Sequence, residues 1–137
     1  MHRERIHSEA APRALGPYSQ AIVADDLVFT AGQLGGDPRS GDLAEGIEAQ
    51  TLQALSNIAA VLEAAGAGWG DVVKTTVFLA DMSDFAAFNA VYAEVVEEPF
   101  PARSTVAAAA LPKGALVEID AIAVRGDRRM PEGHPRP

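Results

Sequence analysis

Residues 44–65, AEGIEAQTLQALSNIAAVLEAA, restrict the possible folds of this chain more than any other segment. The apolar residues recur at helical spacing and predict one amphipathic helix. Its expected buried stripe consists of Ile47, Leu52, Leu55, Ile58, Ala59 and Leu62. Asp42 is a candidate N-cap, and Gly66 stands where a glycine commonly ends a helix. A helix with one apolar face needs a second layer of structure to cover it.

Strand patterns lie on both sides of this helix. Residues 20–33 predict a hairpin, because two β-rich runs are separated by two aspartates. Residues 71–81 predict a strand whose two faces are Val73, Thr75, Val77 and Leu79 against Val72, Lys74, Thr76 and Phe78. Residues 103–111 and 115–124 predict two more strands joined by the turn PKG.

A second helix is predicted over residues 83–98, with Ser83 as its cap. Its apolar stripe is Phe85, Phe88, Tyr92 and Val95. The predicted order is therefore ββαβαββ, an α+β two-layer sandwich with two helices on one face of a mixed sheet. The opposite face of the sheet also carries apolar side chains, and self-association would cover them.

Length and composition set the remaining bounds. The 137 residues suit a single domain, with a core at about 10–125 and loose tails at 1–9 and 127–137. The net charge of −8, with basic residues gathered at the two ends, disfavours nucleic acid and anionic membranes as partners. The start of the chain has no apolar signal region, and there are no cysteines, which fits a cytoplasmic protein.

Few residues suit metal or covalent chemistry. His2, His7 and His134 all fall in the expected tails and lack the spacing of metal ligands. Lys74 and Lys113 are the only lysines, and neither stands in a context that favours a covalent nucleophile. We therefore expect no metal site.

Arg103 is the main candidate for ligand binding. It begins a stretch, RSTVAAAAL, that otherwise reads as a buried strand. A guanidinium stays charged wherever the fold places it, so it requires a partner. That partner is a protein carboxylate, the solvent or a ligand, and the residues alone leave these alternatives open.

Glu118 is the second candidate, because strand alternation places it on one face with Asp120. In an apolar pocket its pKa would rise, which suits proton transfer near neutral pH. A solvated face or an ion pair with Arg103 or Lys74 is the alternative. Tyr18 in GPYSQA and Asn89 in the second helix are further polar candidates.

The motifs together resemble the Rid family of reactive-intermediate deaminases, also called YjgF-like proteins. The resemblance covers about residues 10–125 and is carried by GPYSQA, AGQLGGDPRSG, DVVKTTVFLADMSDFAAFNAVY, PARS and LPKGALVEIDAIAV. It implies a chorismate-mutase-like fold, a homotrimer with active sites between subunits, and no cofactor. The implied reaction is hydrolysis of 2-imino acids, or their enamine tautomers, to 2-keto acids and ammonia.

The resemblance also assigns roles to individual residues. Arg103 would bind the substrate carboxylate, and Glu118 would hold or activate water. The other implied substrate-binding residues are Tyr18, Ala31, Gly32, Gln33 and Asn89. Many members have serine where this chain has Ala31, and loss of that hydroxyl would affect substrate range and rate.

Two other functions compete with the deaminase. A trimer that binds a small carboxylate for regulation, or that acts as a chaperone, would need the same arginine without the chemistry. An endoribonuclease or translation inhibitor is disfavoured by the acidic balance and by the lack of histidines in the core.

Overall fold

The computed structural model describes residues 2–125. Its strands and α-helices, in chain order, are β1 (Arg3–Ile6), β2 (Ala21–Ala24), β3 (Leu27–Thr30), β4 (Gln33–Leu34), α1 (Gly46–Ala64), β5 (Val72–Leu79), α2 (Phe85–Val95), β6 (Ala102–Ala107) and β7 (Val117–Val124). Three short 3-10 turns complete it, at Trp69–Asp71, Met82–Asp84 and Pro112–Gly114.

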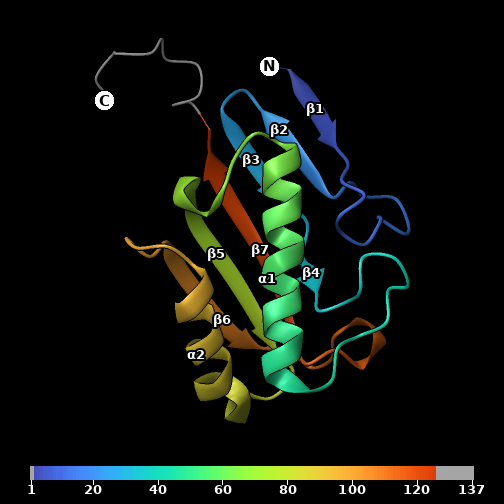
Figure 1. Cartoon of the computed structure of the whole chain (residues 1–137), viewed down its shortest axis with the longest axis vertical. Coiled ribbons are helices and arrows are strands. Elements are labelled where there is room, and N and C mark those ends of the chain that lie inside the picture. Colours follow the sequence, from blue (N-terminus) through green and yellow to red (C-terminus); the bar gives the residue numbers. More distant parts are fainter. Residues whose placement is uncertain (1, 126–137) are drawn as a thin grey trace.

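The strands form one mixed sheet in the order β1-β2-β3-β7-β5-β6, with β4 paired to β7. Strands β5 and β6 are parallel because α2 connects them, and the other pairs are antiparallel. Figure 1 shows both helices on the same side of this sheet. The predicted α+β sandwich with a mixed sheet is confirmed, and β6 is an edge strand.

The core lies between the helices and the sheet. Fully buried side chains from α1 meet those of the two central strands, and the set includes Leu55, Ile58, Leu62, Val77, Leu79, Val117 and Ile119. Burial of each such side chain contributes about 1.5–3 kcal/mol to folding. The predicted stripe is wrong at Leu52, which is 54% exposed, because it lies outside the arc of α1 that faces the sheet.

The helix ends differ in part from the prediction. Gly66 follows α1 with φ +82°, and Ala67 N–H donates to Leu62 O at 2.8 Å, as expected for a glycine C-terminal cap. Asp42 is not the N-cap, because α1 begins after Glu45, which makes no side-chain cap. The predicted Ser83 cap is also wrong.

The start of α2 explains the error at Ser83. A 3-10 turn precedes the helix, and its cap is Asp81, whose carboxylate accepts the backbone N–H of Ser83 at 2.9 Å. This turn moves the first residue of the α-helix to Phe85. Phe88 and Tyr92 are buried as predicted, so the stripe of α2 is confirmed at its centre.

Two strand predictions need correction. Residues 3–6 are not a loose tail, because they pair with β2 as the antiparallel edge strand β1. Strand β5 contains a bulge between Val72 and Lys74, so Val72 is buried and Val73 is 49% exposed, the reverse of simple alternation. The predicted tail at 127–137, with His134, lies outside the described residues.

Candidate active site

Arg103 points toward the helices from the edge strand β6. Its neighbour in the parallel register is Thr75 of β5, which is fully buried on the helix side. The guanidinium carbon lies over three aromatic rings of α2, at 5.6 Å from the centre of Phe85, 5.5 Å from Phe88 and 4.7 Å from Tyr92. These are cation–π contacts, which hold a cation without neutralising its charge.

Of the partners considered for Arg103, a carboxylate of the chain itself is excluded within the described residues. Within residues 2–125 His7 pairs with Glu9, and no carboxylate lies within 4.0 Å of the Arg103 guanidinium. An internal salt bridge, the main alternative for this residue, is therefore absent from the described part of the protein. The positive charge is supported by aromatic faces and stays available to an anion.

Arg103 opens onto a cavity of about 360 Å³. Asn89, Tyr92, Ala93, Phe100 and Pro101 line it with Arg103. Within the described residues the Asn89 amide makes no hydrogen bond, so this cavity combines a free cation, a free amide and apolar walls. Such a lining fits a small carboxylic acid with an apolar substituent.

Glu118 lies on the opposite face of the sheet. Its neighbours Val117 and Ile119 in β7 are buried under the helices, and alternation turns Glu118 away from them. Burial raises the pKa of the Glu118 carboxyl, and the like charge of Asp120 raises it further.

Gly32 provides the space for the Glu118 carboxylate. A Cβ atom on Gly32 would lie 2.8 Å from Glu118 Cδ and would collide with the carboxylate oxygen. The requirement for glycine here comes from this close approach and not from a left-handed backbone. A side chain at position 32 would therefore displace the Glu118 carboxylate.

Tyr18, Gly32 and Gln33 line a second cavity of about 130 Å³, together with Arg13 and Lys113. Tyr18 is 54% exposed, and its hydroxyl accepts the Leu15 N–H at 3.4 Å. Gln33 is only 6% exposed, because β4 turns it toward the helix side of β7.

Ala31 does not line either of these two cavities. Its backbone N–H donates to Gln20 O at 2.8 Å, and its carbonyl accepts the Thr30 hydroxyl at 2.9 Å. Through these backbone contacts Ala31 helps to fix the end of strand β3.

The predicted residues thus form two half-sites. Arg103 and Asn89 share one cavity on the helix side, whereas Tyr18, Gly32 and Gln33 share another, next to Glu118. Because Arg103 and Glu118 project from opposite faces of one sheet, a single chain does not bring them together. A site that uses both must combine two copies of the chain.

Three buried amides that the sequence reasoning missed hold the loops around Gly32. Gln20 Nε2 donates to Pro12 O at 2.8 Å, and its Oε1 accepts the Ser8 N–H. Asn57 bonds the carbonyls of Leu34 and Gly36, and Gln50 joins Ala44 to Leu116. In the sequence, the only sign that these amides are buried is their position within an otherwise apolar pattern.

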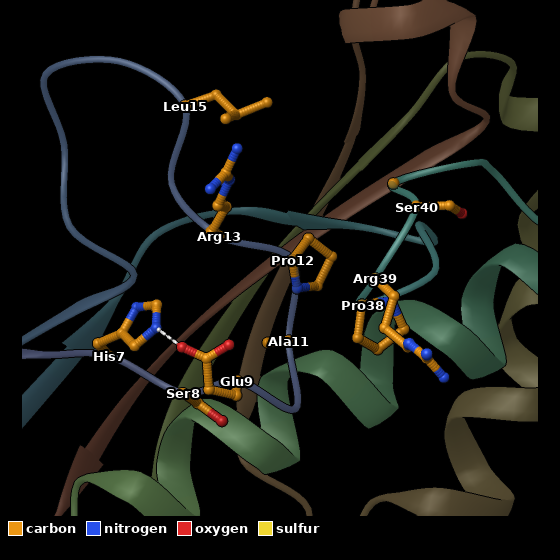
Figure 2. A pocket seen from close by; sticks show the side chains of 11 residues that line it. His7, Ser8, Glu9, Ala11, Pro12, Arg13, Leu15, Pro38, Arg39 and Ser40 are labelled. Atoms are coloured by element: carbon orange, nitrogen blue, oxygen red, sulfur yellow. Dashed lines mark hydrogen bonds and ion pairs between the residues drawn. The ribbon is translucent and has the colours of Figure 1, made fainter.

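A larger cavity of about 620 Å³ lies between residues 7–15 and 38–41 (Figure 2). His7 and Glu9 form a hydrogen bond of 2.7 Å there. In Figure 2, Arg13 and Arg39 stand on separate segments and extend in different directions. Because its polar groups do not converge, this cavity is a weaker candidate for a substrate site than the two half-sites.

No three His, Asp or Glu side chains group as metal ligands within residues 2–125. Nor does this part of the chain contain a helix long and apolar enough to cross a membrane. Lys74 Nζ donates to Thr76 Oγ1 at 3.3 Å and lies near Asp120, while Lys113 Nζ donates to Gly41 O at 2.6 Å. Both lysines are therefore engaged.

Comparison with known proteins agrees with this architecture. Residues 8–125 match the family model described as Endoribonuclease L-PSP, and the chain belongs to this family, the YjgF/Rid family. The 2-iminobutanoate/2-iminopropanoate deaminase of Capra hircus is 50% identical over 125 residues, which cover 90% of this chain and 91% of that protein.

Solved structures give the same result. RidA from Psychrobacter sp. PAMC 21119 is 48% identical, with a TM-score of 0.86 over 88% of this chain and 98% of that one. TdcF of E. coli, solved with bound serine, is 39% identical, with a TM-score of 0.83 over 89% of this chain and 98% of that one. The family resemblance and fold expected from the sequence motifs are confirmed.

Proposed function

We propose that this protein is a deaminase that hydrolyses 2-imino acids, or their enamine tautomers, to 2-keto acids and ammonia. The single observation that carries the proposal is the unpaired Arg103 guanidinium, held by aromatic rings in the wall of a cavity of about 360 Å³. Relatives named as 2-iminobutanoate/2-iminopropanoate deaminases support the reaction class.

Arg103 binds the substrate carboxylate in this proposal. Its planar fork matches a carboxylate with two parallel hydrogen bonds, and each is stronger than a neutral one. Asn89 lies beside it and can donate to the substrate or orient a water molecule. The carboxylate is thereby fixed and the imine carbon placed for attack.

Glu118 acts as the proton carrier. It accepts a proton from water as the C–O bond forms at the imine carbon, and it passes that proton to the imine nitrogen, which gives a neutral carbinolamine. It then accepts the proton of the carbinolamine hydroxyl and passes it to the amino nitrogen as the C–N bond breaks. Ammonia leaves, the carbonyl of the 2-keto acid remains, and the enzyme ends with the protons it began with. A carboxyl with a raised pKa suits both steps near neutral pH.

We infer that the working unit is a homotrimer with each site between two subunits. The separation of Arg103 and Glu118 across the sheet supports a shared site, and the trimer itself is implied by the family. The helix-free face also exposes apolar side chains at Leu27, Phe29, Val106 and Val124, which a second copy would cover.

A coupled assay tests the function. Threonine dehydratase releases 2-iminobutanoate, which water hydrolyses slowly, so addition of this protein should accelerate 2-oxobutanoate release in proportion to its concentration. A protein that only binds small carboxylates would leave the rate unchanged. That result would favour the regulatory alternative and overturn the proposed deaminase.

The Asp120→Asn variant should shift the acid limb of the pH profile to lower pH. The charge of Asp120 helps to raise the Glu118 pKa, so its removal lets that pKa fall. Glu118 then stays ionised, and active as a base, in more acidic solution. The measurement is kcat/KM against pH, and Asp120→Glu, which keeps the charge, is the control. An unchanged limb, or one at higher pH, would contradict the assignment of Glu118 as the base.

A further inference from the structure

Tyr92 links the guanidinium of Arg103 to the buried layer of the fold. Its ring is the closest of the three to the guanidinium, at 4.7 Å, and the residue is only 4% exposed. Figure 1 shows α2, which carries Tyr92, on the same side of the sheet as α1 and next to the edge strand β6. Sequence periodicity explains Tyr92 as a core residue but not this contact.

The orientation of the Tyr92 ring is fixed from two sides. Its hydroxyl forms a buried hydrogen bond of 2.7 Å with the hydroxyl of Thr75. The ring also packs against Phe88, with centroids 5.4 Å apart and planes tilted by 45°. Thr75 is the register partner of Arg103 in the neighbouring strand, so Tyr92 is tied to the strand beside the arginine.

We propose that Tyr92 is a positioning residue that aims the Arg103 guanidinium at the carboxylate of the substrate. A carboxylate partner would hold Arg103 equally well, but it would compete with the substrate for the same donors. The aromatic rings offer no carboxylate oxygen to those donors, because each contacts the guanidinium through its π system. This inference rests on the proposed function, in which Arg103 binds the substrate.

The first measurement is discrimination between 2-oxobutanoate and its uncharged amide, 2-oxobutanamide, by NMR titration. Tyr92→Leu removes the ring and should reduce the preference for the acid by roughly 2- to 30-fold. Tyr92→Phe and Thr75→Val keep the ring and should retain most of the preference for the acid. Trp69→Leu replaces a buried aromatic that makes no contact with Arg103 and should leave the preference unchanged.

A double-mutant comparison separates positioning from general loss of structure. In an Arg103→Ala background, Tyr92→Leu should cause no further loss of discrimination, because Tyr92 acts only through the arginine. Equal losses for the acid and the amide, or an additive loss in the Arg103→Ala background, would overturn the proposal.

The second measurement does not depend on turnover or binding. Ring currents from α2 should shift the Arg103 Nε–H resonance in the folded protein, and Tyr92→Leu should move it toward the position of an exposed arginine. An unmoved resonance would overturn the role of Tyr92 even in an active enzyme. Absence of imine hydrolysis by the unmodified protein would instead overturn the proposed function, so the two failures are distinguishable.

Discussion

Replacement of Arg103 by alanine is expected to reduce kcat/KM for 2-iminobutanoate by roughly 10²–10⁴-fold, the cost of two charge-assisted hydrogen bonds to a carboxylate. The fold should persist, because the described residues include no carboxylate that the loss would leave unpaired. The measurements are the coupled assay and the thermal unfolding midpoint.

Two variants control for this result. Arg103→Lys keeps the charge but loses the planar fork, so its activity should fall between those of the parent and Arg103→Ala. Arg125→Ala removes another arginine, one that donates to Ala65 O at 2.8 Å, and should leave turnover unchanged. Normal turnover in a folded Arg103→Ala protein would refute the carboxylate-binding role, and failure of that variant to fold would make Arg103 structural.

The Glu118→Gln variant should lower kcat by roughly 10²–10⁴-fold, the usual range for loss of a general base. Its stability should not fall in parallel. Because the folded state raises the pKa of Glu118, that state holds the proton more tightly, and stability is lost as pH rises through and above the ordinary carboxyl range. Glutamine has no such loss, so the variant should be at least as stable as the parent at neutral pH.

The test compares kcat and the unfolding midpoint at acidic and neutral pH. Glu94→Gln, which neutralises an exposed carboxylate on α2, is the matched control and should change neither value much. A Glu118→Gln enzyme with parental kcat would show that another group handles the proton.

The two inactive variants also test the shared site when they are combined. In a shared site, one subunit supplies Arg103 and the next supplies Glu118. A mixed oligomer therefore contains an intact site wherever a Glu118→Gln chain, which keeps Arg103, supplies the arginine and an Arg103→Ala chain, which keeps Glu118, supplies the glutamate. Random mixing in equal amounts should restore about one quarter of the sites of a cyclic oligomer. A site within one chain would recover nothing, because no chain in the mixture carries both groups.

Much of the fold could be predicted because its signals are local. The hairpin, both helices and the order of elements from β2 to β7, apart from the two-residue strand β4, follow from periodicity and from turn residues at known spacing. Strand β1 was missed because Arg3–Ile6 is short and charged and gains its place only by pairing with β2. The bulge at Val73 has no local signal, since it reflects how β5 fits against β7.

The site could be predicted as a set of residues but not as an arrangement. Motifs identify Arg103 and Glu118, whereas their placement on opposite faces depends on which strands become neighbours in the sheet. The aromatic support of Arg103 is also non-local, because it joins α2 to β6. The loop-holding amides Gln20 and Asn57 look like ordinary polar residues until the carbonyls that they meet are known.

The glycine beneath Glu118 has a consequence for how the carboxylate is held. Backbone at Gly32 forms a floor under the carboxylate, and no hydrogen bond from another described residue anchors its oxygens. An ionised carboxylate offers about four lone-pair positions. In the proposed mechanism these positions are open to the attacking water molecule and to the amino group that leaves, because the backbone at Gly32 confines Glu118 by shape and not by hydrogen bonds.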